Sequence, residues 1–419
     1  MAGVGLPTPE ELRAEVAAFV DAHWSDTVTV RAWWRALADA RLAMPQLPEP
    51  WGRGYDRERT RVVSQVLRDR DVLGPAGGIG TSLALPTLLH CGTPEQIARF
   101  VPPLIDGPEG WCQLLSEPGA GSDLASLQTK AVRDGDEWVV TGQKVWTSTG
   151  QFADFGILIA RTDPDAPKHR GITYFVFPMR QPGVEVRPLV EMTGHAVFNE
   201  VFLDGARVPH ANVLGGLHDG WSVANTTLQH ERAGIGGSDG SFSRAFPGSV
   251  AGHLDRPAVS FLRTQRAVFG GGVGPGTLRR VTELGRSAGR LDDPRVRDRL
   301  AALHTQVELL RMTGVLAKVN GTRTSVDGSL AKIAMTRAVH AARDLACELA
   351  GPAAQLGAAD GPFDGWLAEY TLFSPAPGIY GGTDEIQRNI IGERGLGLPK
   401  EPGPDRDTPF KDLLVGTQR

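Results

Sequence analysis

The sequence predicts an α+β protein in which helices come first, strands follow, and helices return. Residues 1–112 and 216–398 place apolar residues at alternating spacings of three and four, the pattern of helices with one buried face. Residues 113–215 instead hold short runs of branched and aromatic residues separated by Gly, Asp and Pro. We therefore expect an N-terminal helical domain, a small middle β-barrel domain, a C-terminal helical bundle, and a tail over 399–419 whose end is mobile.

Helix starts in the first domain carry capping signals. Thr8 can cap a helix whose first turn holds Pro9, and Glu11 can complete a capping box. Residues 93–96 repeat the same order of residue types. Two local signals of this kind favour helices that begin at these points.

Four runs in the middle domain have the composition of strands: 137–141, 155–160, 172–177 and 197–203. Turn-forming clusters separate them, so we expect an antiparallel domain that ends near Pro209.

Three helices are predicted in the C-terminal domain, the first beginning after residues 292–294 and the others covering 329–350 and 384–393. The first has an apolar seam with heptad spacing, formed by Val296, Leu300, Leu303, Val307, Leu310, Gly314 and Ala317. Residues 234–276 are glycine-rich at both ends and support no fold prediction.

Composition excludes several classes of protein. Lys plus Arg is 44 and Asp plus Glu is 48, so the net charge of −4 argues against a nucleic-acid or anionic-membrane binder. Cys91, Cys112 and Cys347 are too few and too widely spaced for a disulfide framework or a thiolate zinc site. The ten histidines form no ligand pair, so no metal is expected. Without a signal sequence or an apolar run of about 18 residues, a cytoplasmic location is expected.

Two neighbouring motifs carry the chemistry. Residues 115–126 read LSEPGAGSDLAS, and residues 142–150 read GQKVWTSTG. Gly119 and Gly121 allow the backbone to approach a bulky ligand, and the adjacent N–H and hydroxyl groups can bind phosphate or ring carbonyls. For the first motif alone, a Gly-Ser turn at the entrance of a sheet is the better interpretation of these residues.

With a third segment, IYGGTDEIQRNII at 379–391, the chain resembles the acyl-CoA dehydrogenase family. The three segments occur in the family's order, on a helix–sheet–helix plan of the family's size. The resemblance implies the family's fold, FAD as cofactor, an acyl-CoA substrate and an electron-transfer flavoprotein or similar acceptor. It also implies lipid or steroid metabolism.

The resemblance implies roles for individual residues. Ser116 contacts the pyrimidine side of the flavin, Trp146 covers the isoalloxazine, and Thr383 and Glu385 contact the adenine half. The full implied set for FAD is Gln113, Leu115, Ser116, Gly121, Ser122, Trp146, Thr147, Ser148, Arg286, Glu348, Gly351, Thr383 and Glu385. Arg286, Glu348 and Gly351 are implied to reach the cofactor of a neighbouring subunit, so a homo- or hetero-oligomer, dimer or tetramer, is expected.

The implied reaction removes an α proton and a β hydride from an acyl thioester, and it needs a carboxylate base. In the commonest family pattern a glutamate follows the tyrosine of the C-terminal motif, whereas this chain has Gly381. Glycine keeps an N–H that can donate to the thioester oxygen, so Gly381 is retained as a catalytic residue.

Glu231 lies where other family members carry the base on a helix, and we predict that it supplies the missing carboxylate. Burial beside an acyl chain would raise its pKa above about 4.3. The alternative is an exposed helical glutamate paired with Arg232 or another cation. The residues implied to contact the substrate are Ser122, Glu231, Arg232 and Gly382. Glu117 and Asp123 are expected to brace the first motif.

Two other functions compete with this dehydrogenase. Because of Gly381, the chain could instead hold FAD, or act structurally, in a hetero-oligomer whose partner supplies the base. Family members of actinobacterial steroid degradation form such mixed assemblies. A flavin oxidase or monooxygenase on the same fold is the third option, because fold alone does not fix chemistry.

Overall fold

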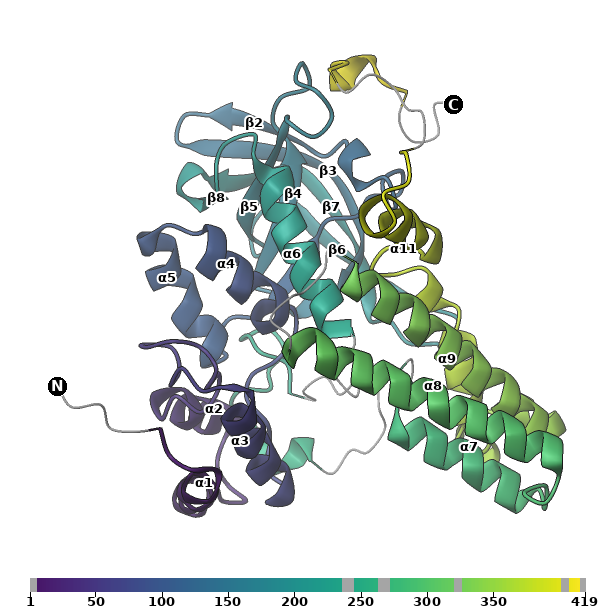
Figure 1. Cartoon of the computed structure of the whole chain (residues 1–419). Coiled ribbons are helices and arrows are strands. Elements are labelled where there is room, and N and C mark those ends of the chain that lie inside the picture. Colours follow the sequence, from purple (N-terminus) through teal and green to yellow (C-terminus); the bar gives the residue numbers. More distant parts are fainter. Residues whose placement is uncertain (1–5, 236–244, 263–271, 320–325, 401–406, 415–419) are drawn as a thin grey trace.

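The computed structural model describes residues 6–235, 245–262, 272–319, 326–400 and 407–414 (Figure 1). Among the described residues, the first domain holds five α-helices: α1 (Pro9–His23), α2 (Val30–Asp39), α3 (Arg57–Asp69), α4 (Leu85–Cys91) and α5 (Pro94–Ile105). A π-helical turn over Gly80–Ala84 leads directly into α4. The predicted capping boxes are confirmed, because the side chains of Thr8 and Thr93 accept from the N–H groups three residues on, and Glu11 and Gln96 reach back.

The middle domain is one eight-stranded sheet. Its strands are β1 (Trp111–Leu114), β2 (Lys130–Asp134), β3 (Glu137–Ser148), β4 (Phe155–Arg161), β5 (Ile172–Pro178), β6 (Val184–Leu189), β7 (Phe198–Pro209) and β8 (Val213–Leu214). The order is β6-β7-β3-β2-β4-β5-β8, with β1 paired to β4. The expectation of a purely antiparallel domain is wrong, because β1 pairs with β4 in parallel.

Helices return in the last domain: α6 (Gly220–Ile235), α7 (Pro275–Ser287), α8 (Pro294–Val319), α9 (Asp327–Ala350), α10 (Trp366–Phe373) and α11 (Asp384–Ile390). The start of α8 is confirmed, and its seam packs inward, with Val296, Leu303 and Val307 at most 4% exposed. The side chain of Ala317 lies outside the described part of the chain.

Residues 245–262, for which the sequence supports no fold prediction, pack onto the N-terminal domain. The Arg31 N–H donates to the carbonyl of Leu254 at 2.8 Å, and the Ala258 N–H donates to that of Val28 at 2.8 Å. Leu254 and Phe261 are buried in the same core as the first helices. The rest of the 234–276 segment falls partly outside the described residues.

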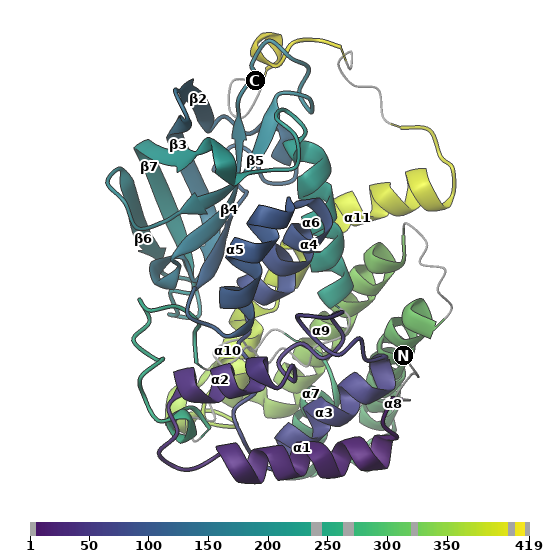
Figure 2. The ribbon, with the colours of Figure 1, turned by 90° about the vertical axis from the view of Figure 1, so that its left-hand side faces the viewer.

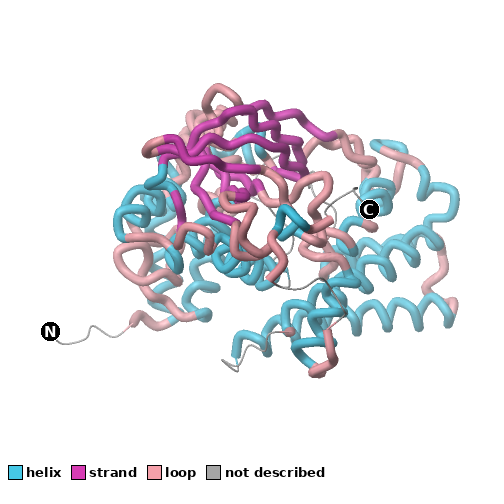
Figure 3. The backbone as a smooth tube through the Cα atoms, turned by 90° about the horizontal axis from the view of Figure 1, so that it is seen from above, coloured by secondary structure: helices cyan, strands magenta, loops and turns pink. Residues whose placement is uncertain are grey.

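The last part of the chain packs on both of the others, because α6 contacts α4 as well as β5. Figures 2 and 3 show the strands gathered on one side of the molecule and the long helices of the bundle on the other. Helix α6 packs on β5 and on α9, so it connects the sheet to the bundle. The predicted fold class is thereby confirmed.

Candidate active site

The first motif is a turn braced by a buried ion pair. The backbones of Glu117 and Ala120 exchange hydrogen bonds of 3.1 and 3.0 Å, which closes the turn through Pro118 and Gly119. The Glu117 carboxylate, 8% exposed, accepts from the Lys144 ammonium at 2.8 Å and from the N–H groups of Gln128 and Thr129. Burial by itself would raise the pKa of Glu117, but Lys144 and the two N–H donors lower it.

The second motif is joined to the first by the backbone. The Val145 N–H donates to the carbonyl of Ser116 at 2.9 Å, and the fully buried Lys144 also donates to the carbonyl of Leu115 at 3.0 Å. Ser116 therefore lies beside the strand that carries Trp146. Ser116 and Ser148 are half-buried, whereas Gly121 and Ser122 are exposed.

Trp146 has a strained backbone at a β-bulge. Lys144 pairs with Val201 and Thr147 with Asn199, so three steps on β3 face two on β7. Trp146 takes a φ of +60°, although a bulky side chain disfavours the left-handed region, and 60% of the residue is exposed. Its ring meets Phe198 edge-on at 5.9 Å and leaves an indole face available to a planar ligand. Strain of this kind concentrates at functional sites.

Next to Trp146, the paired residues Thr147 and Asn199 each have one polar atom without a hydrogen-bond partner in the described structure. The Asn199 amide donates to the carbonyl of Thr147 at 3.0 Å and to Gln151, but its oxygen and the Thr147 hydroxyl are buried and unpaired. A buried polar group without a partner costs about 1–3 kcal/mol. Together with the exposed indole, these atoms fit a planar cofactor with hydrogen-bonding edges. The sequence did not single out Asn199, because its signal lies in pairing across strands.

The C-terminal motif forms a tight turn before α11. Gly381 and Gly382 have φ values of +63° and +84°, a region that side chains rarely adopt. The fully buried Gln387 donates to the carbonyl of Gly381 at 2.7 Å, and a Cβ at Gly382 would lie 2.6 Å from the Gln387 nitrogen. The Thr383 side chain caps α11, and Glu385 pairs with Arg388.

Helix α6 brings Glu231 toward this turn. Glu231 is partly exposed, and its charge, after burial, is the second cause that raises the pKa of Tyr380 to about 12. Glu231 therefore lies within electrostatic range of Tyr380, the residue before Gly381, although Tyr380 follows it by 149 positions in sequence. The side chain of Arg232 lies outside the described part of the chain.

A buried network of hydroxyl groups, one turn before Glu231, fixes the position of α6. The Thr227 hydroxyl lies 3.0 Å from the hydroxyl of Tyr174 on β5 and 3.0 Å from that of Thr87 on α4. All three residues are fully buried. The network therefore fixes α6 against both the sheet and the N-terminal domain.

Arg286, Glu348 and Gly351 do not join this group within the chain. Arg286 pairs with Glu283, and Glu348 pairs with Arg290 and Arg299. They lie at the end of the bundle where α7 connects to α8, which points away from the sheet in Figure 1. Gln113, half-buried on β1, and Leu115, 2% exposed, lie next to the first motif.

The described residues contain no group of three or more His, Cys, Asp or Glu side chains arranged to hold a metal ion. None of their helices combines the length and apolar character needed to cross a membrane.

Comparison with known proteins places this arrangement in context. Profiles of the acyl-CoA dehydrogenase N-terminal, middle and C-terminal domains match residues 8–108, 112–205 and 276–396. Acyl-CoA dehydrogenase IpdE1 of Mycobacterium tuberculosis is 38% identical over 374 residues, which cover 88% of each protein. Acyl-CoA dehydrogenase FadE34 of the same organism is 51% identical over 235 residues, but these span only 32% of its length.

Solved structures agree with the sequence relatives. A variant of the steroid ACAD Tcur3481-Tcur3483 superposes with a TM-score of 0.72 at 26% identity, over 94% of this chain and 99% of that one. The ChsE4-ChsE5 complex of Mycobacterium tuberculosis gives a TM-score of 0.68 at 28% identity, over 96% of this chain and 100% of that one.

Proposed function

The chain belongs to the acyl-CoA dehydrogenase family, and from that premise we propose that it oxidises the α,β bond of an acyl-CoA thioester with Glu231 as base. The observation that carries the proposal is that Glu231, on α6, lies within electrostatic range of Tyr380, the residue before Gly381. A helix-borne carboxylate at this turn replaces the glutamate that position 381 lacks.

Each half of the proposed chemistry has its own residue. Glu231 accepts the α proton, and the N–H of Gly381 donates to the thioester oxygen, where negative charge develops. The Gln387 bond to the Gly381 carbonyl and the left-handed φ keep this turn in one conformation. Preorganised donors of this kind act without reorganisation during the reaction.

The residues around Trp146 are proposed to hold FAD. Bound FAD supplies acceptance of the β hydrogen as hydride and onward transfer to an external acceptor such as an electron-transfer flavoprotein. Trp146 offers an exposed ring, while the Thr147 hydroxyl and the Asn199 oxygen offer unpaired polar atoms. Ser116 and Ser148 lie on the joined motifs, and Thr383 lies at the start of α11.

Substitution of the base tests the proposal. In Glu231→Gln, we expect anaerobic flavin bleaching by a panel of acyl-CoA thioesters to slow about 10²- to 10⁴-fold, while FAD stays bound. Glu58→Gln, an exposed glutamate on α3, is the matched control and should bleach normally. Unchanged bleaching in Glu231→Gln would reject Glu231 as the base.

A second candidate is a subunit of a hetero-oligomer in which a related chain supplies the base. It is favoured by Gly381 and by relatives whose solved structures carry two chain names, Tcur3481-Tcur3483 and ChsE4-ChsE5. Tcur3481-Tcur3483 is a steroid ACAD, which supports a bulky acyl group as substrate. Native mass spectrometry after co-expression with a related chain separates the cases, because a self-sufficient enzyme assembles, binds FAD and bleaches alone.

A further inference from the structure

The C-terminal tail docks on the middle domain. The Phe410 N–H donates to the carbonyl of Ala166 at 3.0 Å, and the Lys411 N–H donates to that of Pro164 at 3.0 Å. Lys411 also pairs with Asp165 at 2.6 Å. Figures 1 and 2 show residues 407–414, the yellow segment at the end of the chain, on the side of the molecule that holds the sheet and away from α11. Residues 407–414 are thus attached to the loop between β4 and β5.

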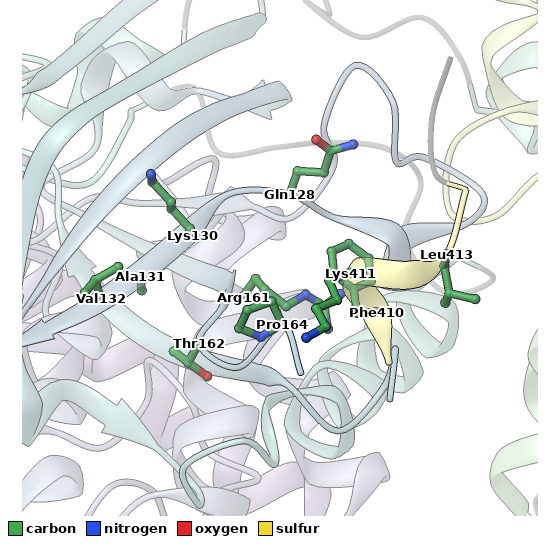
Figure 4. A pocket seen from close by; sticks show the side chains of 10 residues that line it. All are labelled: Gln128, Lys130, Ala131, Val132, Arg161, Thr162, Pro164, Phe410, Lys411 and Leu413. Carbon is green, nitrogen blue, oxygen red and sulfur yellow. The ribbon is translucent and has the colours of Figure 1, made fainter. Parts of the chain in front are cut away.

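Phe410 covers a buried cation. Its ring lies 3.6 Å from the guanidinium carbon of Arg161, and the two residues are 8% and 4% exposed. Both line a pocket of about 350 Å³ between the tail and the sheet, shown in Figure 4. No residue predicted to bind FAD or substrate lines this pocket. The tail is therefore part of a structure separate from the Trp146 site.

Arg161 connects that structure to the first motif. It donates to the carbonyl of Lys168 in the β4–β5 loop and to that of Ala125 near the end of the first motif, each at 2.7 Å. Its Nε is buried without a partner in the described structure, and burial lowers its pKa to about 10. An aromatic ring over the guanidinium offsets part of this desolvation.

Lys168 completes the connection. Its ammonium donates to both oxygens of Asp123 at 2.6 Å, and Asp123 also accepts from the Ser126 hydroxyl at 2.5 Å. Asp123 directly follows the exposed turn of Gly121 and Ser122, and Ser122 is among the residues predicted to contact the substrate. A continuous set of contacts thus runs from the tail to the substrate side of the site.

We propose that residues 407–414 form a strap that positions the Gly121–Ser122 turn for the CoA part of the substrate. Phe410 and Arg161 are positioning residues in this scheme, and neither touches the reacting atoms. The strap holds Arg161 in contact with both the β4–β5 loop and the first motif. Lys168, whose carbonyl accepts from Arg161, holds Asp123 in turn through its ammonium group. The link to CoA rests on the proposed function, whereas the ordering of the turn does not.

Binding of free coenzyme A, measured by titration calorimetry on the FAD-loaded full chain, tests the link to substrate. We expect Phe410→Ala to raise the Kd for CoA about tenfold at unchanged FAD content. Phe410→Tyr keeps an aromatic ring over Arg161, so its Kd should equal that of the unmodified protein. Leu414→Ala, at a residue 72% exposed on the same tail, should leave the Kd unchanged. A purely structural role would lower the unfolding temperature without changing this Kd.

Amide hydrogen exchange tests the ordering independently. The N–H groups of Ser126 and Arg170 are hydrogen-bonded next to the two ends of the network and should exchange faster in Phe410→Ala than in Leu414→Ala. Equal exchange in the two variants would overturn the strap. An unchanged Kd with faster exchange would overturn its link to substrate. If the unmodified protein binds no CoA, the proposed function fails, and exchange still decides on the strap.

Discussion

At the scale of single residues, the backbone explains why position 381 favours glycine. A φ of +63° is open to glycine and strained for a glutamate, so this turn is unsuited to carry the base of the commoner pattern. Glu231 sits in a helix, where ordinary backbone geometry places a carboxylate without strain. In the proposed mechanism the proton acceptor, Glu231, and the hydrogen-bond donor, the N–H of Gly381, therefore belong to different elements of the fold.

Gly381→Ala tests the conformational requirement. We expect the variant to lose about 1–2 kcal/mol of unfolding free energy, because alanine pays the left-handed penalty. Thermal and denaturant unfolding measure this loss. Gly378→Ala is the control, since a Cβ there meets only Thr336 at an ordinary distance of 3.6 Å. Equal stability of the two variants would show that the turn relaxes at no cost.

Acid should weaken the brace of the first motif. Because the folded pKa of Glu117 is lowered, its contribution to stability is present above its ordinary value of 4.5 and is lost as pH falls through the folded pKa. We expect the unfolding temperature to fall in that acid range, and to fall less steeply in Glu117→Gln. Identical pH profiles of the two proteins would contradict this assignment.

At the scale of elements, the packing of α6 decides where Glu231 lies. Thr227 binds hydroxyl groups from β5 and α4, so the helix is fixed by polar contacts as well as by apolar burial. Such fully paired networks specify one arrangement of a core. The bulge in β3 likewise decides where Trp146 lies, because the extra residue changes the direction of the side chain.

A double-mutant cycle measures the α6 network. Thr227→Val should cost about 1–3 kcal/mol of stability, since the buried hydroxyls of Tyr174 and Thr87 each lose their hydrogen bond to Thr227. Tyr174→Phe in the same protein should cost less than it does alone, giving a coupling of about 0.5–3 kcal/mol. Strictly additive effects in urea unfolding would show that the two hydroxyls act independently. In the proposed mechanism, Thr227→Val should also slow bleaching.

At the scale of the whole molecule, the sequence predicted what depends on neighbours in the chain. The capping residues Thr8 and Glu11 and the start of α8 are local signals, and the structure confirms them. The return of Leu254 and Phe261 to the N-terminal core, and the docking of Phe410 on Arg161, depend on contacts across more than 200 positions. No local pattern encodes such contacts. The conformation of Trp146 likewise depends on pairing between β3 and β7.

The outer face of α8 leads to a prediction about assembly. Leu309, Met312 and Leu316 recur at helical spacing and are 47–58% exposed, an apolar stripe typical of a protein contact. Arg286 and Glu348 lie in the same bundle and are proposed to reach the FAD of a neighbouring subunit. We therefore expect a second copy, or a related chain, to cover this stripe.

Leu309→Glu combined with Leu316→Glu should break the assembly, because two buried charges without partners oppose association. Light scattering after size exclusion should show a smaller species, and the FAD content of this species should fall, since each site would lose its neighbour. Leu6→Glu is the control, because this residue is 51% exposed and lies near the N-terminus, far from α8 in sequence. If assembly is lost but FAD is fully retained, the stripe is confirmed as the interface. The expectation that a neighbouring subunit helps to hold FAD would then be wrong.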